Sequence, residues 1–203
     1  MTLIDYPNKV DSRLTNPLSN KSKTLTYAHR CNIACVALNP QGSLLLSVDE
    51  DGRAILSHIH RQVVLYHFSF KSSVLALKFS PDGKFFAACI GRYVELWHAP
   101  SSPGTQAGYE IDFAPFVRHH VHAGHYDTVQ SIQWSADSRF FLSGSKDLTS
   151  RLWSVNPEDG FVPTVLAGHR QGVINAWFSA DQESVSQPQF KVNLMLILFR
   201  SIL

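Results

Sequence analysis

The chain has 203 residues, of which 44% are hydrophobic and 17% are charged, and its formal net charge is +2. This composition is ordinary for a soluble globular protein and excludes a disordered, low-complexity chain. The sequence pI of about 8.5 stays below the value of about 9 that by itself suggests a nucleic-acid surface. Charge alone therefore names no partner.

The first segment, residues 1–23, is polar and shows no sustained hydrophobic period. We interpret it as a loose polar lead-in with room for one strand. It has neither a basic leader nor a long apolar run, so no secretory signal is expected. Near the other end, Val192 to Phe199 is mostly apolar but far shorter than the roughly 20 residues needed to cross a bilayer. We therefore expect no membrane contact.

Between residues 24 and 182, four stretches share one register. Each begins with an aliphatic residue, reaches a large apolar residue five positions later and then enters a turn: Ile33 to Gly42, Val74 to Gly83, Val129 to Ser138 and Val173 to Gln182. The starting residues are separated by 74−33=41, 129−74=55 and 173−129=44 positions. Two of these separations match the period of roughly 40 to 45 residues that is typical of four-stranded propeller blades. We assign the longer one to an insertion at about residues 98–121.

The segments between the turns are short and rich in β-forming residues. Asp51-Gly52 and Asp82-Gly83 supply the residue with positive φ that tight hairpins need. This pattern predicts an all-β fold, an incomplete β-propeller of about three and a half blades of four-stranded antiparallel sheets. The fourth unit starts at His169, and residues 183–203 are expected to be an irregular apolar tail that is foreign to the repeat.

Three cysteines occur, Cys31, Cys35 and Cys89, without the regular spacing of a disulfide framework. We interpret them as small apolar residues of strands, kept reduced inside the cell. Cys31 and Cys35 alone are too few for a zinc site, which needs four ligands.

The third unit contains His125, Ser143, Asp147 and Trp153, and a serine, a histidine and an aspartate also occur together in hydrolases. However, the chain has no Gly-x-Ser-x-Gly nucleophile elbow. The other units keep parts of the same set, namely His29 and Asp51 in the first, Trp97 in the second and His169 in the fourth. Because catalysis needs one copy of a site, repeated partial copies indicate scaffolding. We therefore predict no catalytic residue and no enzyme activity.

Histidines are concentrated just before the third unit, where Arg118 is followed by His119, His120 and His122. Alternation along a strand would place His120 and His122 on one face and His119 on the other. Without an adjacent Asp, Glu or Cys, the pattern does not favour a metal site, and no cofactor is expected. We predict that these four residues form a basic or hydrogen-bonding interaction strip at the edge of a blade.

The motifs Gly124-His125, Ser143 to Asp147 and Arg151-Leu152-Trp153 resemble the WD-repeat family, with Trp153-Ser154 in place of the usual Trp-Asp pair. The resemblance implies a structural tetrad, in which hydrogen bonds run from the Trp153 indole to Ser143, then to His125 and then to Asp147. Such a network would satisfy polar groups that otherwise cost about 1 to 3 kcal/mol each when buried.

Longer strings are similar to one branch of these proteins, the fungal members of the periodic tryptophan protein 2 family: Asp49 to Leu56, His67 to Val74, Phe79 to Lys84 and Ala114 to His125. Members of that branch are several times longer, so the chain is expected to correspond to an N-terminal fragment. The resemblance implies a nucleolar scaffold of the UTP-B subcomplex in the small-subunit processome. Its implied partners are other processome proteins, pre-rRNA and box C/D small nucleolar RNA.

Two questions remain open from the sequence. One alternative function is an adaptor in another complex, such as a ubiquitin ligase or a chromatin complex. The second question is direct RNA contact, for which the basic residues lack an aromatic-plus-basic motif. We interpret them as solvated surface charge and expect RNA contact to be indirect or weak: Lys21, Lys23, Arg30, Arg61, Lys71, Arg118 and Arg139.

Overall fold

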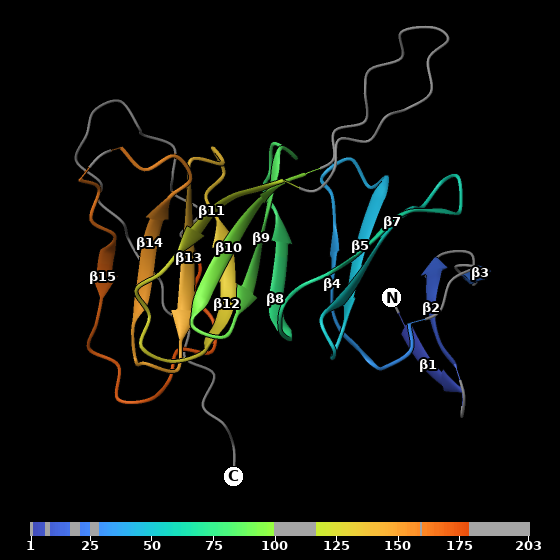
Figure 1. Ribbon diagram of the computed structural model, residues 1–203, viewed down its shortest axis with the longest axis horizontal. Coiled ribbons are helices and arrows are strands. Elements are labelled where there is room, and N and C mark those ends of the chain that lie inside the picture. Colours follow the sequence, from blue (N-terminus) through green and yellow to red (C-terminus); the bar gives the residue numbers. More distant parts are fainter. Residues whose placement is uncertain are drawn as a thin grey trace, which may run out of the picture. The chain divides into compact units, whose positions relative to one another are not determined.

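The computed structural model describes residues 2–6, 9–16, 21–24, 29–99, 117–158 and 160–178. All regular elements in these ranges are strands, arranged as one three-stranded and three four-stranded antiparallel sheets (Figure 1). The prediction of an all-β fold is thereby confirmed. The described ranges contain no helix able to span a membrane. The chain divides into two compact units, residues 1–74 and 75–203, which are described in turn.

The first unit begins with a small sheet in the order β1-β2-β3. Its strands are β1 (Thr2–Tyr6), β2 (Lys9–Asn16) and β3 (Lys21–Thr24). The sequence suggested one strand in this lead-in, and the structure has three. The antiparallel ladder is made by backbone groups, so a polar segment can pair without the hydrophobic alternation on which the expectation depended.

The first unit also contains a complete four-stranded blade. Its strands follow the chain in order: β4 (Ile33–Leu38), β5 (Leu44–Asp49), β6 (Arg53–His58) and β7 (Val63–Ser69). All residues of β5 are buried, whereas β7 is mostly exposed or half-buried. This gradient fits the sequence, because a strand covered on both faces needs a nearly continuous apolar run such as Leu44-Leu45-Leu46.

The second unit contributes a blade whose sheet order is β11-β10-β9-β8. The strands are β8 (Val74–Phe79), β9 (Phe85–Ile90), β10 (Tyr93–His98) and β11 (Arg118–His122). The expected insertion at 98–121 is thus shorter than predicted, because both of its ends belong to strands. Residues 100–116 lie outside the described ranges.

The third blade has the order β12-β13-β14-β15. Its strands are β12 (Val129–Trp134), β13 (Phe140–Ser145), β14 (Ser150–Ser154) and β15 (Thr164–Leu166). The described part of the fourth unit ends at residue 178 and is not assigned to a strand. It nevertheless covers the third blade, since Val173 and Ala176 are buried against Leu142 and Leu152. The tail predicted for residues 183–203 lies outside the described residues.

The core of the second unit lies between its two blades. Residues of β9 and β10 pack against residues of β12, β13 and β14 in one buried cluster that includes Leu96, Val129, Phe141 and Trp153. Burying one side chain of this size contributes roughly 1.5 to 3 kcal/mol. Two blades that share a core in this way cannot separate without exposing it.

The turn that follows the first strand of each blade is held by a side chain at the same repeat position. Ser80 Oγ accepts the backbone N–H of Phe85 over 3.0 Å, and Ser135 Oγ accepts that of Phe140 over 3.0 Å. In the first blade, Asn39 Oδ1 has the same role. These side chains set where the second strand begins, and that strand carries the polar residues described next.

Candidate functional site

In the third blade, four side chains from two strands and two loops form one network of hydrogen bonds. Trp153 on β14 donates its indole Nε1–H to Ser143 Oγ on β13 over 2.8 Å. Ser143 Oγ lies 2.7 Å from Nε2 of His125, which precedes β12. His125 Nδ1 lies 2.8 Å from Asp147 Oδ2 in the β13–β14 turn. These contacts follow the order that the WD-repeat resemblance implied.

Asp147 is the charged end of this network. Burial raises the pKa of its carboxyl, but hydrogen bonds from Thr149, from the Tyr126 backbone and from His125 outweigh this and lower the pKa to about 2. Thr149 Oγ1 donates over 2.6 Å and the Tyr126 N–H over 2.9 Å. Sequence reasoning missed Thr149, although an Asp side chain in a turn commonly accepts the backbone N–H two residues later, as Asp147 does from Thr149 over 3.0 Å.

The proton positions follow from Asp147. An ionised carboxylate only accepts hydrogen bonds, so His125 donates from Nδ1. Burial is the main cause that lowers the pKa of His125, which leaves Nε2 as an acceptor for the Ser143 hydroxyl. Ser143 can then accept from Trp153, because an indole N–H is a donor only. In this assignment every polar side-chain atom of the four tetrad residues has a hydrogen-bond partner.

This arrangement immobilises Ser143 and gives it no access to a substrate. The residue is 0% exposed, and the ring of Trp153 lies beside His125 with centroids 6.0 Å apart. A nucleophilic serine must reach a carbonyl carbon at about 3 to 3.5 Å, and here the surrounding side chains occupy that space. The tetrad ties β13 and β14 to the loop before β12.

The first blade has a related network with a different aspartate. His29 Nε2 lies 2.8 Å from Ser47 Oγ, and His29 Nδ1 lies 3.4 Å from Asp49 Oδ2. The predicted partner, Asp51, is exposed and instead accepts a hydrogen bond from Cys31 Sγ over 2.9 Å. The prediction for Asp51 is corrected, because Asp49 lies on the buried end of β5 whereas Asp51 lies in the turn.

The second blade replaces the tetrad serine with Ala88, which pairs with Glu95 across β9 and β10. Trp97 Nε1 therefore donates to Glu95 Oε2 over 3.1 Å. The other oxygen of Glu95 accepts a hydrogen bond from Arg118 over 3.2 Å. An ion pair thus takes the place of the neutral serine and histidine. In the fourth unit, His169 is half-buried, and any tetrad partners further along that unit would lie outside the described residues.

The predicted interaction strip on β11 does not present all four residues to solvent. Arg118 and His120 are exposed and His119 is half-buried, with its Nε2 3.0 Å from Asn156 Oδ1. His122 is buried between blades, with its ring centroid 4.9 Å from that of Phe141. Burial, followed by the charges of His120 and His119, lowers the pKa of His122 to about 3. His122 is therefore a core residue and does not belong to the surface strip.

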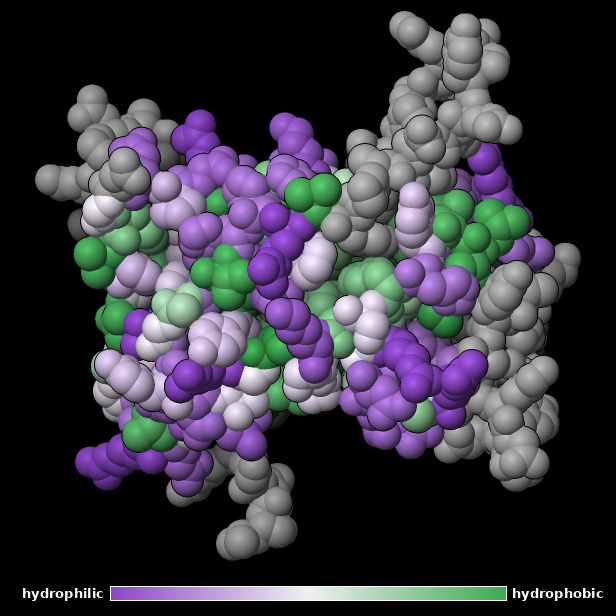
Figure 2. Space-filling model, in the orientation of Figure 1, coloured by the Kyte–Doolittle hydropathy of each residue, from purple (hydrophilic) through white to green (hydrophobic). Residues whose placement is uncertain are grey.

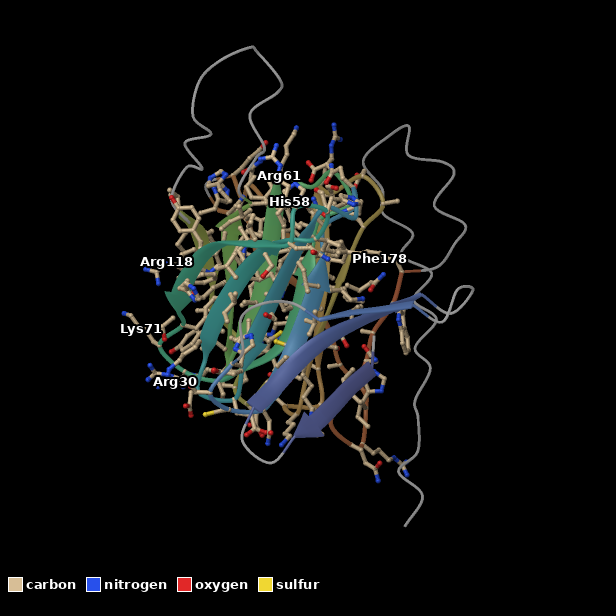
Figure 3. All side chains as sticks on the ribbon, turned by 90° about the vertical axis from the view of Figure 1, so that its right-hand side faces the viewer. Arg30, His58, Arg61, Lys71, Arg118 and Phe178 are labelled. Carbon is tan, nitrogen blue, oxygen red and sulfur yellow. The ribbon has the colours of Figure 1, made fainter. Side chains whose placement is uncertain are left out.

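Basic side chains of the first unit lie at both ends of its blade, as Figure 3 shows. Arg30 and Lys71 lie near one end, and Arg61 lies near His58 at the other. The three exposed side chains, Arg30, Lys71 and Arg61, are thus divided between two surfaces. In the described ranges, no group of three or more His, Cys, Asp or Glu side chains is arranged to hold a metal ion.

The repeat, its blades and its tetrad together have counterparts among known proteins. The family described as WD domain, G-beta repeat matches residues 20–56, 62–98 and 117–154, together more than half of the chain. The chain belongs to the WD-repeat family. Domains with this fold are generally interaction scaffolds without catalytic activity, in keeping with the immobilised Ser143.

Named relatives confirm the resemblance to periodic tryptophan protein 2. The chain is 60% identical over 178 residues to the Periodic tryptophan protein 2 homolog of Neurospora crassa, covering 87% of this chain and 20% of that protein. It is 49% identical over 169 residues to Periodic tryptophan protein 2 of Saccharomyces cerevisiae, covering 83% of this chain and 18% of that protein. The chain thus spans about a fifth of the length of these relatives.

Solved structures agree on the fold. The structure titled "Crystal structure of RRP9 WD40 repeats" matches with a TM-score of 0.58 and 23% identity, covering 75% of this chain and 43% of that chain. The structure titled "Structure of U3-55K" matches with the same TM-score and coverage. At this level of identity the match supports the WD-repeat architecture alone.

Proposed function

We propose that the chain is a non-enzymatic scaffold segment in the biogenesis of the small ribosomal subunit, acting in the UTP-B subcomplex of the small-subunit processome. The observation that carries the proposal is the 60% identity over 178 residues to a Periodic tryptophan protein 2 homolog. The buried tetrad supports a structural role, because its serine, histidine and aspartate are used to hold strands and loops together. Other processome proteins, pre-rRNA and box C/D small nucleolar RNA are the proposed partners, and the nucleolus is the proposed location.

Affinity purification tests this function. The chain is tagged and expressed in a fungus, and the purified material is analysed by mass spectrometry and RNA sequencing. The proposal predicts processome proteins and pre-rRNA in the eluate and a nucleolar signal in microscopy. Recovery of ubiquitin-ligase or chromatin subunits in their place would support the alternative adaptor function and overturn the proposal.

A matched variant sharpens the experiment. Ser143→Ala removes the hydroxyl that His125 and Trp153 share while leaving the surface unchanged. If the tetrad is structural, this variant loses stability and its partners in parallel, and lowering the temperature restores both. Partner loss in a variant that unfolds like the wild-type chain would contradict the structural role.

A further inference from the structure

Tyr126 projects from the second unit and is held there by the tetrad. It is 85% exposed, the largest exposed fraction among the large apolar side chains of the described residues. Its backbone N–H donates over 2.9 Å to Asp147 Oδ2, the same oxygen that lies 2.8 Å from His125 Nδ1. An aromatic ring on a fixed loop loses little conformational freedom when a ligand binds to it.

Arg151 lies beside this ring. Its guanidinium carbon is 5.8 Å from the centroid of Tyr126, within the distance of about 6 Å at which a cation is attracted to an aromatic face. Gly124 makes room for it, since a Cβ there would lie 2.8 Å from Arg151 Nη1. Arg151 thus occupies one side of the ring, and most of the remaining ring surface is open to solvent.

A second pair of the same kind lies at the same end of the unit. In the β9–β10 turn, the Arg92 guanidinium carbon is 5.2 Å from the ring centroid of Tyr93, which is 37% exposed. The Val129 N–H donates over 2.8 Å to Gly91 O, which joins this turn to the loop that carries Tyr126. Figure 1 shows the β9–β10 and β13–β14 turns at the lower end of the second unit.

The exposed charges at this end are mainly positive. Lys146 is exposed in the β13–β14 turn, and its N–H donates over 2.9 Å to Thr128 O beside Tyr126. Arg170 is also exposed. It lies close to Lys146 in space, since Gly172, two residues further on, approaches Lys146 so closely that a Cβ there would lie 3.0 Å from Lys146 Cα. With Arg92 they give three exposed cations, against the exposed carboxylate of Asp127.

We propose that this end of the second unit binds single-stranded RNA, with Tyr126 as the platform on which a base stacks. The inference rests on the proposed role in pre-rRNA processing and names the surface that would make the contact. Aromatic rings beside cations are the combination that single-stranded nucleic acids recognise, because bases stack on the ring and phosphates pair with the cations. Figure 2 shows hydrophobic and hydrophilic residues interspersed on one face of this unit. At the proposed site itself, the exposed cations Arg92, Lys146 and Arg170 favour RNA over an apolar protein segment.

The test uses the purified 203-residue chain and a labelled RNA of about 12 nucleotides, a length that fills a site of about 4 to 16 nucleotides. Fluorescence anisotropy gives the Kd at several salt concentrations. Tyr126→Ala is expected to raise the Kd about tenfold, whereas Tyr126→Trp should retain binding because it keeps an aromatic face. Val162→Ala, at an exposed position on the approach to β15, is the control and should leave the Kd unchanged.

Salt dependence tests the cations separately. Lys146→Gln should reduce the slope of log K against log salt by about 0.7, the value for one phosphate contact on a single strand. Lys84→Gln is the matched control, because Lys84 is 76% exposed but lies in the β8–β9 turn. The slope should stay the same in that variant.

Two results would overturn the inference: an unchanged Kd in Tyr126→Ala, or no RNA binding by the wild-type chain. Either could occur while affinity purification still recovers processome proteins, and then the RNA site alone is wrong. Conversely, RNA binding could depend on Tyr126 while affinity purification recovers an unrelated complex. That result would support the RNA site and contradict the proposed function.

Discussion

The indole Nε1 of Trp153 donates to Ser143 Oγ over 2.8 Å, and both residues are almost completely buried. Replacing Trp153 with alanine removes a large ring from the shared core of two blades and leaves the Ser143 hydroxyl without its donor. We expect Trp153→Ala to lower the free energy of unfolding by about 3 kcal/mol or more. Chemical denaturation measures this change, and a loss below about 1 kcal/mol would contradict the packing of Trp153.

Ser143→Ala and Ser47→Ala form a matched pair, because both serines contact a buried histidine. Ser143 also accepts a hydrogen bond from the Trp153 indole. In the first blade, the position that corresponds to Trp153 is occupied by Ser57, so Ser47 has no indole donor there. Removing Ser143 leaves one more buried polar group without a partner. We expect Ser143→Ala to cost about 1 to 3 kcal/mol more than Ser47→Ala. Equal losses in denaturant titrations would show that the indole bond adds no stability.

His122 should make the chain sensitive to acid. Burial lowers the pKa of its folded state from 6.5 to about 3, so between these values the unfolded chain binds a proton that the folded chain does not. The contribution of His122 to the free energy of unfolding is therefore fully present above pH 6.5. It decreases as the pH falls below 6.5, by about 1.4 kcal/mol per pH unit for one such group. His125 and His29, whose pKa values burial also lowers, act in the same direction.

His122→Phe isolates this contribution. Phenylalanine keeps a ring beside Phe141 and Trp153 and removes the buried Nε2, which has no hydrogen-bond partner among the described residues. The stability of this variant, measured by denaturation from pH 7 to pH 4.5, should fall less steeply than that of the wild-type chain. Identical pH profiles would show that His122 is accessible to protons in the folded state.

Gly52 and Gly42 test the hairpin turns of the first blade. Both have positive φ, +81° and +70°, but only Gly52 is crowded, since a Cβ there would lie 2.6 Å from Ser72 O. Alanine at either position strains the backbone, and at Gly52 it must also displace a carbonyl. We expect Gly52→Ala to lower the free energy of unfolding by about 1 to 3 kcal/mol more than Gly42→Ala does. Similar thermal stabilities for the two variants would be inconsistent with the close approach to Ser72.

Regular spacing predicted the blades, and the resemblance to the WD-repeat family implied the third-unit tetrad. Ser143 and Asp147 follow the same turn that Ser135 begins, so their positions along the chain determine their positions in the sheet. The first unit was predicted incorrectly, because Asp51 has the same spacing from His29 (51−29=22) as Asp147 has from His125 (147−125=22), yet the contact is made by Asp49. Burial at the end of β5 selects Asp49, and the sequence carries no separate signal for that choice.

Contacts between distant residues were the part that sequence reasoning could not supply. Tyr126 and Arg151 are brought together only by the pairing of β13 with β14 and by the Asp147 bond to the Tyr126 backbone. Likewise, Glu95 accepts the hydrogen bond of the Trp97 indole, because Ala88 occupies the position of the tetrad serine and has no hydroxyl. Each partner is an ordinary surface residue when only its neighbours in the chain are considered.

Because Trp97 bonds to Glu95, the two blades of the second unit should respond differently to dissolved salt. Arg118, which pairs with Glu95, is nearly half exposed, so dissolved electrolyte weakens that contact, whereas the neutral link from Trp153 to Ser143 is shielded from it. Amide exchange in β10 and β11 should accelerate in concentrated potassium chloride while β13 and β14 keep their protection. Repeats of one sheet architecture thereby differ in how strongly dissolved ions act on them.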